Sequence, residues 1–142
     1  MELTRELLLG SDYYFVVVKN GILLTGKQGG GIKPIIEAID DLGENIQGST
    51  VGCRILGKAS ALLCAYAKVA GVYTPQATKK AIAVLIRANI PGRADQIIPH
   101  VKDRGNTDVT DVSRFENMVI NIDSPEEAYN ILKNTYKNII KR

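Results

Sequence analysis

Two groups of glycine and lysine residues are the strongest candidates for chemistry in this sequence of 142 residues. The first is Gly57-Lys58, which joins an apolar segment to an Ala/Leu-rich one. A strand that enters a helix through Gly-Lys directs backbone N–H groups and a cation toward one point, which favours an anion. The second group runs from Lys27 to Lys33, where Gly29-Gly30-Gly31 frees the backbone to approach a ligand.

Gly57-Lys58 also completes the pattern G-x-x-x-x-G-K of a nucleotide-binding P-loop, which here begins at Gly52. A P-loop needs Ser or Thr at the next position, because that hydroxyl binds Mg²⁺, and this chain has Ala59. We therefore interpret residues 50–54 as an ordinary strand and Gly57 as the residue that permits a tight turn. A bound anion and a solvated surface lysine remain equal alternatives for Lys58, whereas the three glycines favour a mobile connector over an anion loop.

The histidine and cysteine residues are weaker candidates. His100 is the only histidine and has no identifiable partner carboxylate, so a packed or surface role is favoured over that of a general base. Cys53 ends a strand and could react if it faced the helix start, whereas Cys64 lies in the middle of an apolar helix. Core packing is the preferred interpretation of both thiols. One His and two Cys lack the spacing of a zinc site, so no metal is expected.

Alternating strands and helices must position these residues. The β-prone segment 13–18, the dipeptide Asn20-Gly21 and the apolar segment 22–25 predict a β-hairpin. From residue 50 onward, alternating strands and helices predict parallel βαβ units. Thr74 is expected to cap the second of these helices, with Pro75 at its first position. The expected helices are 3–9, 33–42, 57–69, 75–88 and one beginning at 125, and the expected strands are 13–18, 22–25, 50–54, 71–73 and 95–101.

The length and composition fit one α/β domain, residues 1–142, built on a mixed five-stranded sheet. The net charge of +3 comes from scattered basic residues, whereas nucleic-acid binders show a basic stripe with interleaved aromatics. The N-terminus has no secretory signal and no segment approaches the length of a membrane span. We therefore expect a cytoplasmic protein that binds neither nucleic acid nor membrane, and that could form a homodimer through a sheet edge or the C-terminal helix.

Three motifs resemble those of a prokaryotic family of domains of unknown function with a cytidine-deaminase-like fold. They are the predicted hairpin, Gly31-Ile32-Lys33-Pro34 and the segment 51–64 with Gly57-Lys58-Ala59. The resemblance covers nearly the whole chain, through Ser124-Pro125-Glu126-Glu127-Ala128. It implies a three-layer α/β/α sandwich around a five-stranded mixed sheet, while the family itself is uncharacterised.

The resemblance also implies that standard deaminase chemistry is lost. Two helices of zinc deaminases begin with H-x-E (or C-x-E) and P-C-x-x-C. The corresponding segments here read Leu56-Gly57-Lys58-Ala59 and Pro75-Gln76-Ala77-Thr78-Lys79, with no zinc ligands in those places. A Cys-Pro-x-Glu element precedes the last helix of relatives, and Ser113-Arg114-Phe115-Glu116 replaces it here without the cysteine.

From these residues we predict a metal-free and cofactor-free pocket at the carboxyl ends of the parallel strands, where two helices begin. Converging helix dipoles and lysines would favour a small anion, and the resemblance suggests a nucleotide-like one. Two alternatives stay open: a metal-independent enzyme that uses Lys58, with Cys53 as a second candidate, and a structural or interaction module. The predicted lining consists of Gly57, Lys58, Thr74, Gln76 and Lys79, with Lys33 or Glu116 approaching from the loops.

Overall fold

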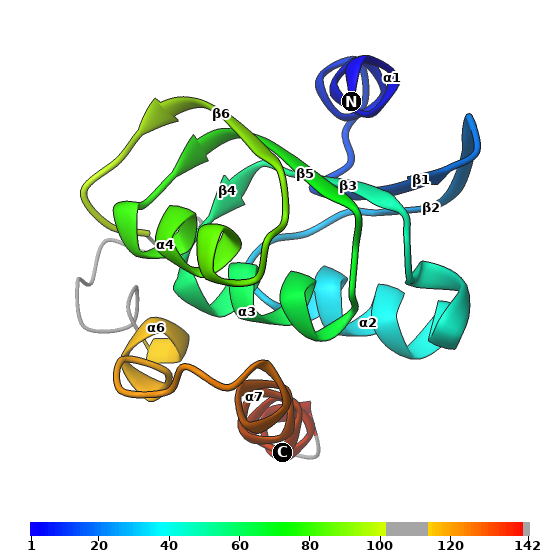
Figure 1. Cartoon of the computed structure of the whole chain (residues 1–142). Helices are drawn as coiled ribbons and strands as arrows, with labels where there is room; N and C mark the ends of the chain where they lie inside the picture. Colours follow the sequence, from blue (N-terminus) through cyan, green and yellow to red (C-terminus); the bar gives the residue numbers. More distant parts are fainter. Residues whose placement is uncertain (102–113, 141–142) are drawn as a thin grey trace.

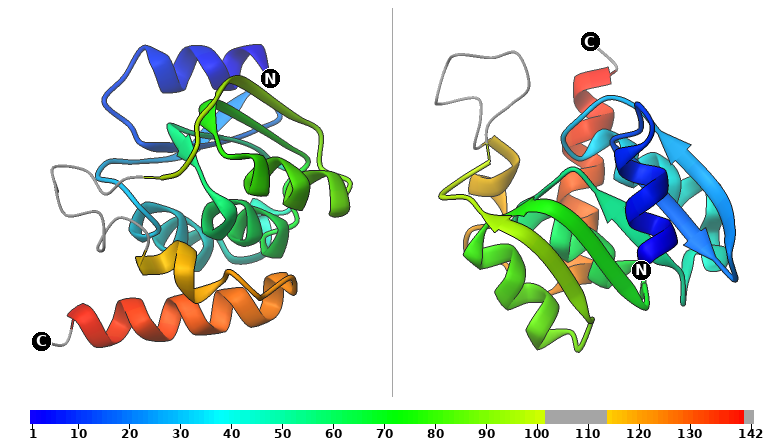
Figure 2. Two further views of the ribbon diagram at one scale, coloured as in Figure 1. Left: turned by 90° about the vertical axis from the view of Figure 1, so that its left-hand side faces the viewer. Right: turned by 90° about the horizontal axis from the view of Figure 1, so that it is seen from above.

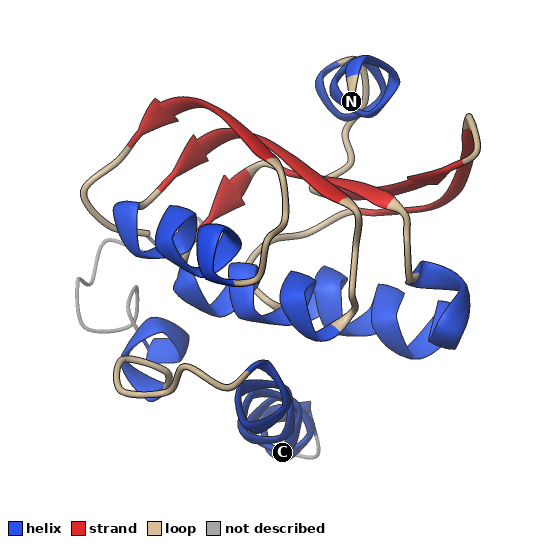
Figure 3. Ribbon diagram, in the orientation of Figure 1, coloured by secondary structure: helices blue, strands red, loops and turns tan. Residues whose placement is uncertain are grey.

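The computed structural model describes residues 1–101 and 114–140, and its helices and strands form layers around one twisted sheet (Figures 1 and 3). The expected loop 102–111 lies outside the described residues. The elements in chain order are α1 (Glu2–Leu9), β1 (Phe15–Lys19), β2 (Ile22–Lys27), α2 (Lys33–Leu42), the 3₁₀ helix η1 (Gly43–Ile46), β3 (Thr50–Cys53), β4 (Ile55–Leu56), α3 (Lys58–Tyr66), β5 (Gly71–Ala77), α4 (Lys79–Arg87), β6 (Gly92–Ile97), α6 (Arg114–Met118) and α7 (Pro125–Ile140).

The β-hairpin predicted from Asn20-Gly21 is confirmed. Strands β1 and β2 pair antiparallel, with Lys19 opposite Ile22, so two residues form the turn. Asn20 and Gly21 have φ angles of 53° and 76°, the left-handed values that a two-residue hairpin turn needs. Local chemistry alone therefore determines this part of the sheet.

The sheet is mixed, as predicted. Its strand order is β2-β1-β3-β5-β4, with β6 also paired to β5, which makes six strands. However, Gly52 lies opposite Tyr73 and Ile55 opposite Gln76, so β3 and β4 pair with β5 in one unbroken parallel register. Strand β4 therefore continues β3 after an interruption at Arg54. If β3 and β4 are counted as one strand, the sheet has the five strands that were predicted.

Helices cover both faces of the sheet, in agreement with the predicted α/β sandwich. Helices α2, α3 and α4 lie on one face, and α1 covers part of the other (Figures 1 and 2). Helices α6 and α7 form a further layer beyond α3 (Figure 2). Because α3 thus lies between the sheet and α7, it is buried on most of its circumference, as its Ala/Leu-rich sequence predicted.

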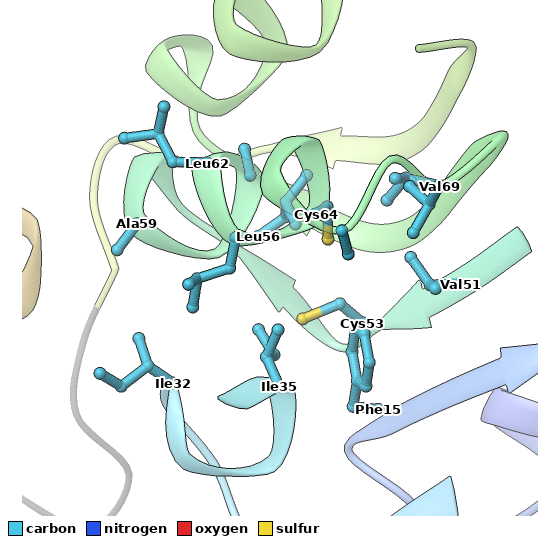
Figure 4. Close-up of a cluster of buried hydrophobic side chains, with 14 of the residues drawn as sticks. Phe15, Ile32, Ile35, Val51, Cys53, Leu56, Ala59, Leu62, Cys64 and Val69 are labelled. Atoms are coloured by element: carbon cyan, nitrogen blue, oxygen red, sulfur yellow. The ribbon is translucent and has the colours of Figure 1, made fainter. Parts of the chain in front are cut away.

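The main core fills the space between the sheet and the layer of α2 and α3 (Figure 4). Val51 and Cys53 of β3 and Leu62 and Cys64 of α3 belong to this cluster, and all four side chains are buried. A smaller cluster of Leu8, Val16 and Tyr73 holds α1 on the opposite face. Both cysteines are free thiols within the fold.

The structure corrects the predicted start of α4. Strand β5 extends to Ala77, pairing with β4 and β6, so Thr74 and Pro75 lie inside a strand rather than at a helix start. Helix α4 begins at Lys79, and the cap is Thr78, whose hydroxyl accepts the N–H of Ala81 at 3.1 Å. The prediction failed because long-range pairing outweighed the local Thr-Pro signal.

Two other predicted boundaries also shift. Strand β6 spans Gly92–Ile97, three residues earlier than the predicted 95–101, so Pro99 and His100 follow the strand. Helix α3 ends at Tyr66 instead of residue 69.

Candidate functional site

The first turn of α3 is capped by a carboxylate from another part of the chain. Oε1 of Glu116 accepts the N–H of Lys58 at 2.7 Å, and Oε2 accepts the N–H of Ala59 at 2.7 Å. Gly57 makes this approach possible, because a Cβ there would overlap Oε1 of Glu116 and lie 2.6 Å from Cγ2 of Val101. A carboxylate of the chain itself, that of Glu116, thus occupies the helix start where the sequence suggested an anionic ligand.

The Lys58 side chain points away from this helix start. Its Nζ donates to the carbonyl of Ile120 at 3.1 Å and forms an ion pair with Asp123 at 3.4 Å. Arg87 lies 3.0 Å from the same Asp123 oxygen. Arg87, followed by Lys58, lowers the pKa of Asp123 below its usual value. Lys58 thus connects α3 to the segment between α6 and α7, and its charge is already paired.

A cavity of about 540 Å³ opens beside Glu116, at the edge of the sheet where β4 and β5 end and α3 and α4 begin. Of the residues predicted to line a pocket, Lys58, Lys79 and Glu116 do so, and Gly57 lies directly behind Glu116. The full lining comprises Lys58, Thr78, Lys79, Lys80, Ile97, Ile98, Pro99, His100, Val101, Glu116, Asn117 and Ile120.

Three of the predicted lining residues lie elsewhere. Thr74 is buried in β5, where its hydroxyl donates to the carbonyl of Gln76 at 2.8 Å and accepts the N–H of Gln76 at 3.2 Å. The Gln76 amide lies 3.5 Å from Gln96 on the neighbouring strand. Lys33 is exposed at the start of α2 and lines neither this cavity nor the larger one described below.

Sequence reasoning missed Thr78 and Lys80 because it placed the start of α4 four residues too early. Thr78-Lys79-Lys80 directly follows β5, so a correct strand end would have found both residues. His100, for which a packed or surface role was favoured over that of a general base, is exposed and lines the cavity after β6. No sequence pattern marked Ile120 as part of the apolar wall. It lies in the segment between α6 and α7, which reaches the cavity only through the tertiary fold.

The two cysteines are poorly placed for chemistry. Cys53 is fully buried, and its thiol donates to the carbonyl of Ile55 at 3.2 Å. Burial raises the pKa of Cys53 to about 12, so the reactive thiolate is scarce at neutral pH. Burial also raises the pKa of Cys64. Figure 4 shows both sulfur atoms among apolar side chains, which argues against a role for Cys53 as a nucleophile.

A second cavity, of about 780 Å³, lies near the start of α2. It contains the three glycines singled out in the sequence, together with Arg54 from the interruption between β3 and β4. Val101 contributes to both cavities. The full lining comprises Ser11, Asp12, Tyr14, Gln28, Gly29, Gly30, Gly31, Arg54, Ile55 and Val101.

The residues that begin α3 and α4 do not fit a zinc ion. These residues are Lys58 and Lys79, and lysine is not among the usual zinc ligands. Within residues 1–101 and 114–140, no three His, Cys, Asp or Glu side chains are grouped so that they could hold a metal.

In the same part of the chain, no helix is long and apolar enough to cross a membrane.

Comparison with known proteins identifies the family. Residues 4–136 match the family model described as "TM1506: Domain of unknown function (DUF1893)". The chain belongs to the DUF1893 family. This result confirms the family resemblance of the sequence motifs. A search of curated proteins found no match.

A crystal structure of a DUF1893 family protein from Thermotoga maritima has the same fold as this chain. The two share 23% sequence identity with a TM-score of 0.80, over 92% of this chain and 86% of the other. Two forms of RibD from Acinetobacter baumannii are similar over smaller regions, 57% of this chain and 27% of RibD. Their identities are 21% and 20%, with TM-scores of 0.47 and 0.48.

Proposed function

We propose that this DUF1893 protein is a cytoplasmic, metal-independent domain that binds a small anionic, nucleotide-like ligand in the 540 Å³ cavity. The observation that carries the proposal is the charge of the cavity lining. Lys58, Lys79 and Lys80 line the cavity, and of these Lys58 is already paired with Asp123. Among the described lining residues the one acidic side chain is Glu116, whose carboxylate is held by the start of α3. The two free, buried cysteines agree with a reducing compartment.

Lys79 and Lys80 supply the charge that an anion would meet. Both side chains are exposed in the first turn of α4, and no ion pair joins either of them to an acidic residue within the described chain. The positive end of the α4 dipole has the same sign as the two lysines. A phosphate or carboxylate of the ligand would therefore lie at the α4 end of the cavity.

The remaining wall suits an apolar or aromatic part of the ligand. Ile97, Ile98, Pro99 and Ile120 form most of it. Ile97 is 49% exposed and Ile120 is 50% exposed, so both side chains are accessible to a ligand in the cavity. An apolar cavity with a few convergent polar groups is the usual form of a small-molecule site. A nucleobase beside a phosphate has this combination of properties.

The test is a titration calorimetry series with nucleoside monophosphates, each paired with its nucleoside. We expect at least one monophosphate to bind and its nucleoside to bind more weakly, because only the phosphate can use the lysines. Replacing both lysines, Lys79→Ala with Lys80→Ala, should weaken monophosphate binding by about tenfold or more, since hydrogen bonds to charged groups contribute roughly 1.5–3 kcal/mol each.

The matched control is Lys137→Ala, which removes an exposed lysine of α7 that does not line the cavity. This variant should bind like the unchanged protein. Equal monophosphate binding by the double lysine variant and the unchanged protein would disprove the proposed site, and so would a series in which no monophosphate binds.

A further inference from the structure

We propose that the 780 Å³ cavity is a second binding site, specific for a free amino acid with a large side chain. Arg54 would bind the carboxylate and Asp12 the ammonium group of this zwitterion. The proposal concerns a different cavity from that of the proposed function and does not depend on it.

Arg54 offers a positive charge that is held in place but not neutralised. Its Nε donates to the carbonyl of Tyr13 at 2.6 Å, and one Nη donates to the carbonyls of Leu8 and Ser11 at 2.7 and 2.6 Å. These three bonds fix the guanidinium plane at the wall of the cavity. No carboxylate of the described chain forms an ion pair with Arg54. Three of its five N–H donors are used by the backbone carbonyls, so the two on the other Nη remain to bind a carboxylate.

Asp12 provides the opposite charge in the same cavity. Its side chain is exposed, and within the described residues it is not within ion-pair distance of Arg54 or any other basic side chain. Two opposite charges that share a cavity without pairing are complementary to a ligand with both charges. A simple anion would be repelled by Asp12, whereas an amino acid satisfies both groups.

The rest of the cavity leaves room for a side chain. Gly29 and Gly31 have φ angles of 101° and 71°, and a Cβ on either would meet open space. These glycines line the cavity with backbone alone. Burial raises the pKa of Tyr14, whose hydroxyl donates to the carbonyl of Ile55 at 3.2 Å, so this wall adds no further charge. The cavity lies in the size range of small-molecule sites and exceeds what a very small amino acid would fill.

The test is a thermal-shift and calorimetry screen with the natural amino acids. We expect at least one large amino acid to raise the melting temperature. Its deamino acid and its decarboxylated amine should each bind at least about tenfold more weakly, because each loses one charged contact. A screen in which no amino acid shifts the melting temperature would overturn the proposal.

One variant tests the ammonium subsite, and a second serves as its control. Asp12→Asn should weaken amino-acid binding by about tenfold while leaving the deamino acid unaffected. Glu6→Gln, which changes an exposed acid of α1 outside the cavity, is the matched control and should bind normally. Unchanged binding by Asp12→Asn would refute the ammonium subsite. The double variant of Lys79 and Lys80 should still bind the amino acid, which separates this proposal from the proposed function.

Discussion

The role of Glu116 as the cap of α3 could not be inferred from the sequence. Its carboxylate satisfies two N–H groups of the first turn of α3, although it is 58 residues away from Lys58 along the chain. These N–H groups have no partner inside the helix, so an acidic group there stabilises the fold. Charge-assisted bonds of this kind contribute roughly 1.5–3 kcal/mol each. The Gly57-Lys58 pattern, which suggested a ligand site, is thus explained partly by the carboxylate of Glu116.

Replacing Gly57 tests this arrangement, because a Cβ would force Glu116 off the helix start. We expect Gly57→Ala to lower the free energy of unfolding by about 1–3 kcal/mol, the usual effect of overpacking. Urea denaturation measures the change. Gly71→Ala is the matched control, since the nearest atom to its Cβ would be the flexible end of Met1 at 3.3 Å and the next, the carbonyl oxygen of Pro91 at 3.6 Å, is at ordinary contact distance. A Gly57→Ala variant with the stability of the original protein would contradict this description of the α3 start.

The pH dependence of stability at alkaline pH should reflect the buried thiol of Cys53. Burial raises its pKa from 9.0 to about 12. Between these values the unfolded chain loses the proton and the native chain keeps it, so unfolding becomes more favourable as pH rises. Denaturation midpoints at pH 8 and about pH 10.5 should therefore differ, and the Cys53→Ala variant should show a smaller difference.

The same burial predicts how Cys53 reacts. Iodoacetamide should leave this thiol unmodified in the native protein at pH 8 and modify it after unfolding. Rapid native modification would show that the thiol is accessible, and would revive the alternative in which Cys53 takes part in catalysis.

At the scale of elements, the sequence predicted well wherever the signal was local. The Asn20-Gly21 turn fixed the hairpin, and α2 has the predicted bounds, ending before Gly43. The Ser124 hydroxyl accepts the N–H of Glu127 at 3.3 Å, so the predicted capping of α7 is present. In each case, residues within a few positions of one another determine the structure.

The start of α4 could not be predicted in this way, because two candidate caps lie four residues apart. Thr74-Pro75 has the stronger local signal, but β5 gains backbone partners on both sides by continuing to Ala77. The Thr74 hydroxyl also hydrogen-bonds to the backbone carbonyl and N–H of Gln76. These bonds lie beside Pro75, whose backbone has no N–H to donate. This shift moved Thr74 and Gln76 out of the predicted site and brought Thr78 and Lys80 into it.

Thr78 should therefore be the residue that begins α4. We expect Thr78→Ala to lower the free energy of unfolding by about 1 kcal/mol, because the N–H of Ala81 loses its partner. Thr78→Ser keeps a hydroxyl at the same place and should retain most of the stability. Thermal or urea denaturation measures both variants, and equal stability of Thr78→Ala and Thr78→Ser would contradict the capping role.

At the scale of the whole molecule, α7 is attached to the helical layer by a small polar and aromatic cluster. The rings of Tyr129 and Tyr66 are stacked, with centroids 4.0 Å apart and planes 4° from parallel. The Tyr129 hydroxyl donates to Asp40 at 2.7 Å, and Lys133 donates to both groups. Because Asp40 belongs to α2 and Tyr66 to α3, one residue of α7 joins three helices.

Two substitutions separate the contributions of the stacked ring and the hydroxyl. Tyr129→Ala should lower the free energy of unfolding by about 3 kcal/mol, as for other large buried aromatics. It should also increase hydrogen exchange in α7 more than in β1. Tyr129→Phe keeps the ring and should cost only about 1 kcal/mol. Equal losses from the two variants would show that the ring contributes little to holding α7.

The positions of α1 and α7 also decide how the chain could be rearranged. The two helices lie on opposite sides of the sheet (Figures 1 and 2), so a peptide that joined residues 1 and 140 would have to pass around the edge of the sheet. A circular permutant of this domain therefore needs a long connecting linker. The exposed Asn20-Gly21 turn is the natural place for its new ends, because opening that turn interrupts no helix and leaves both hairpin strands intact.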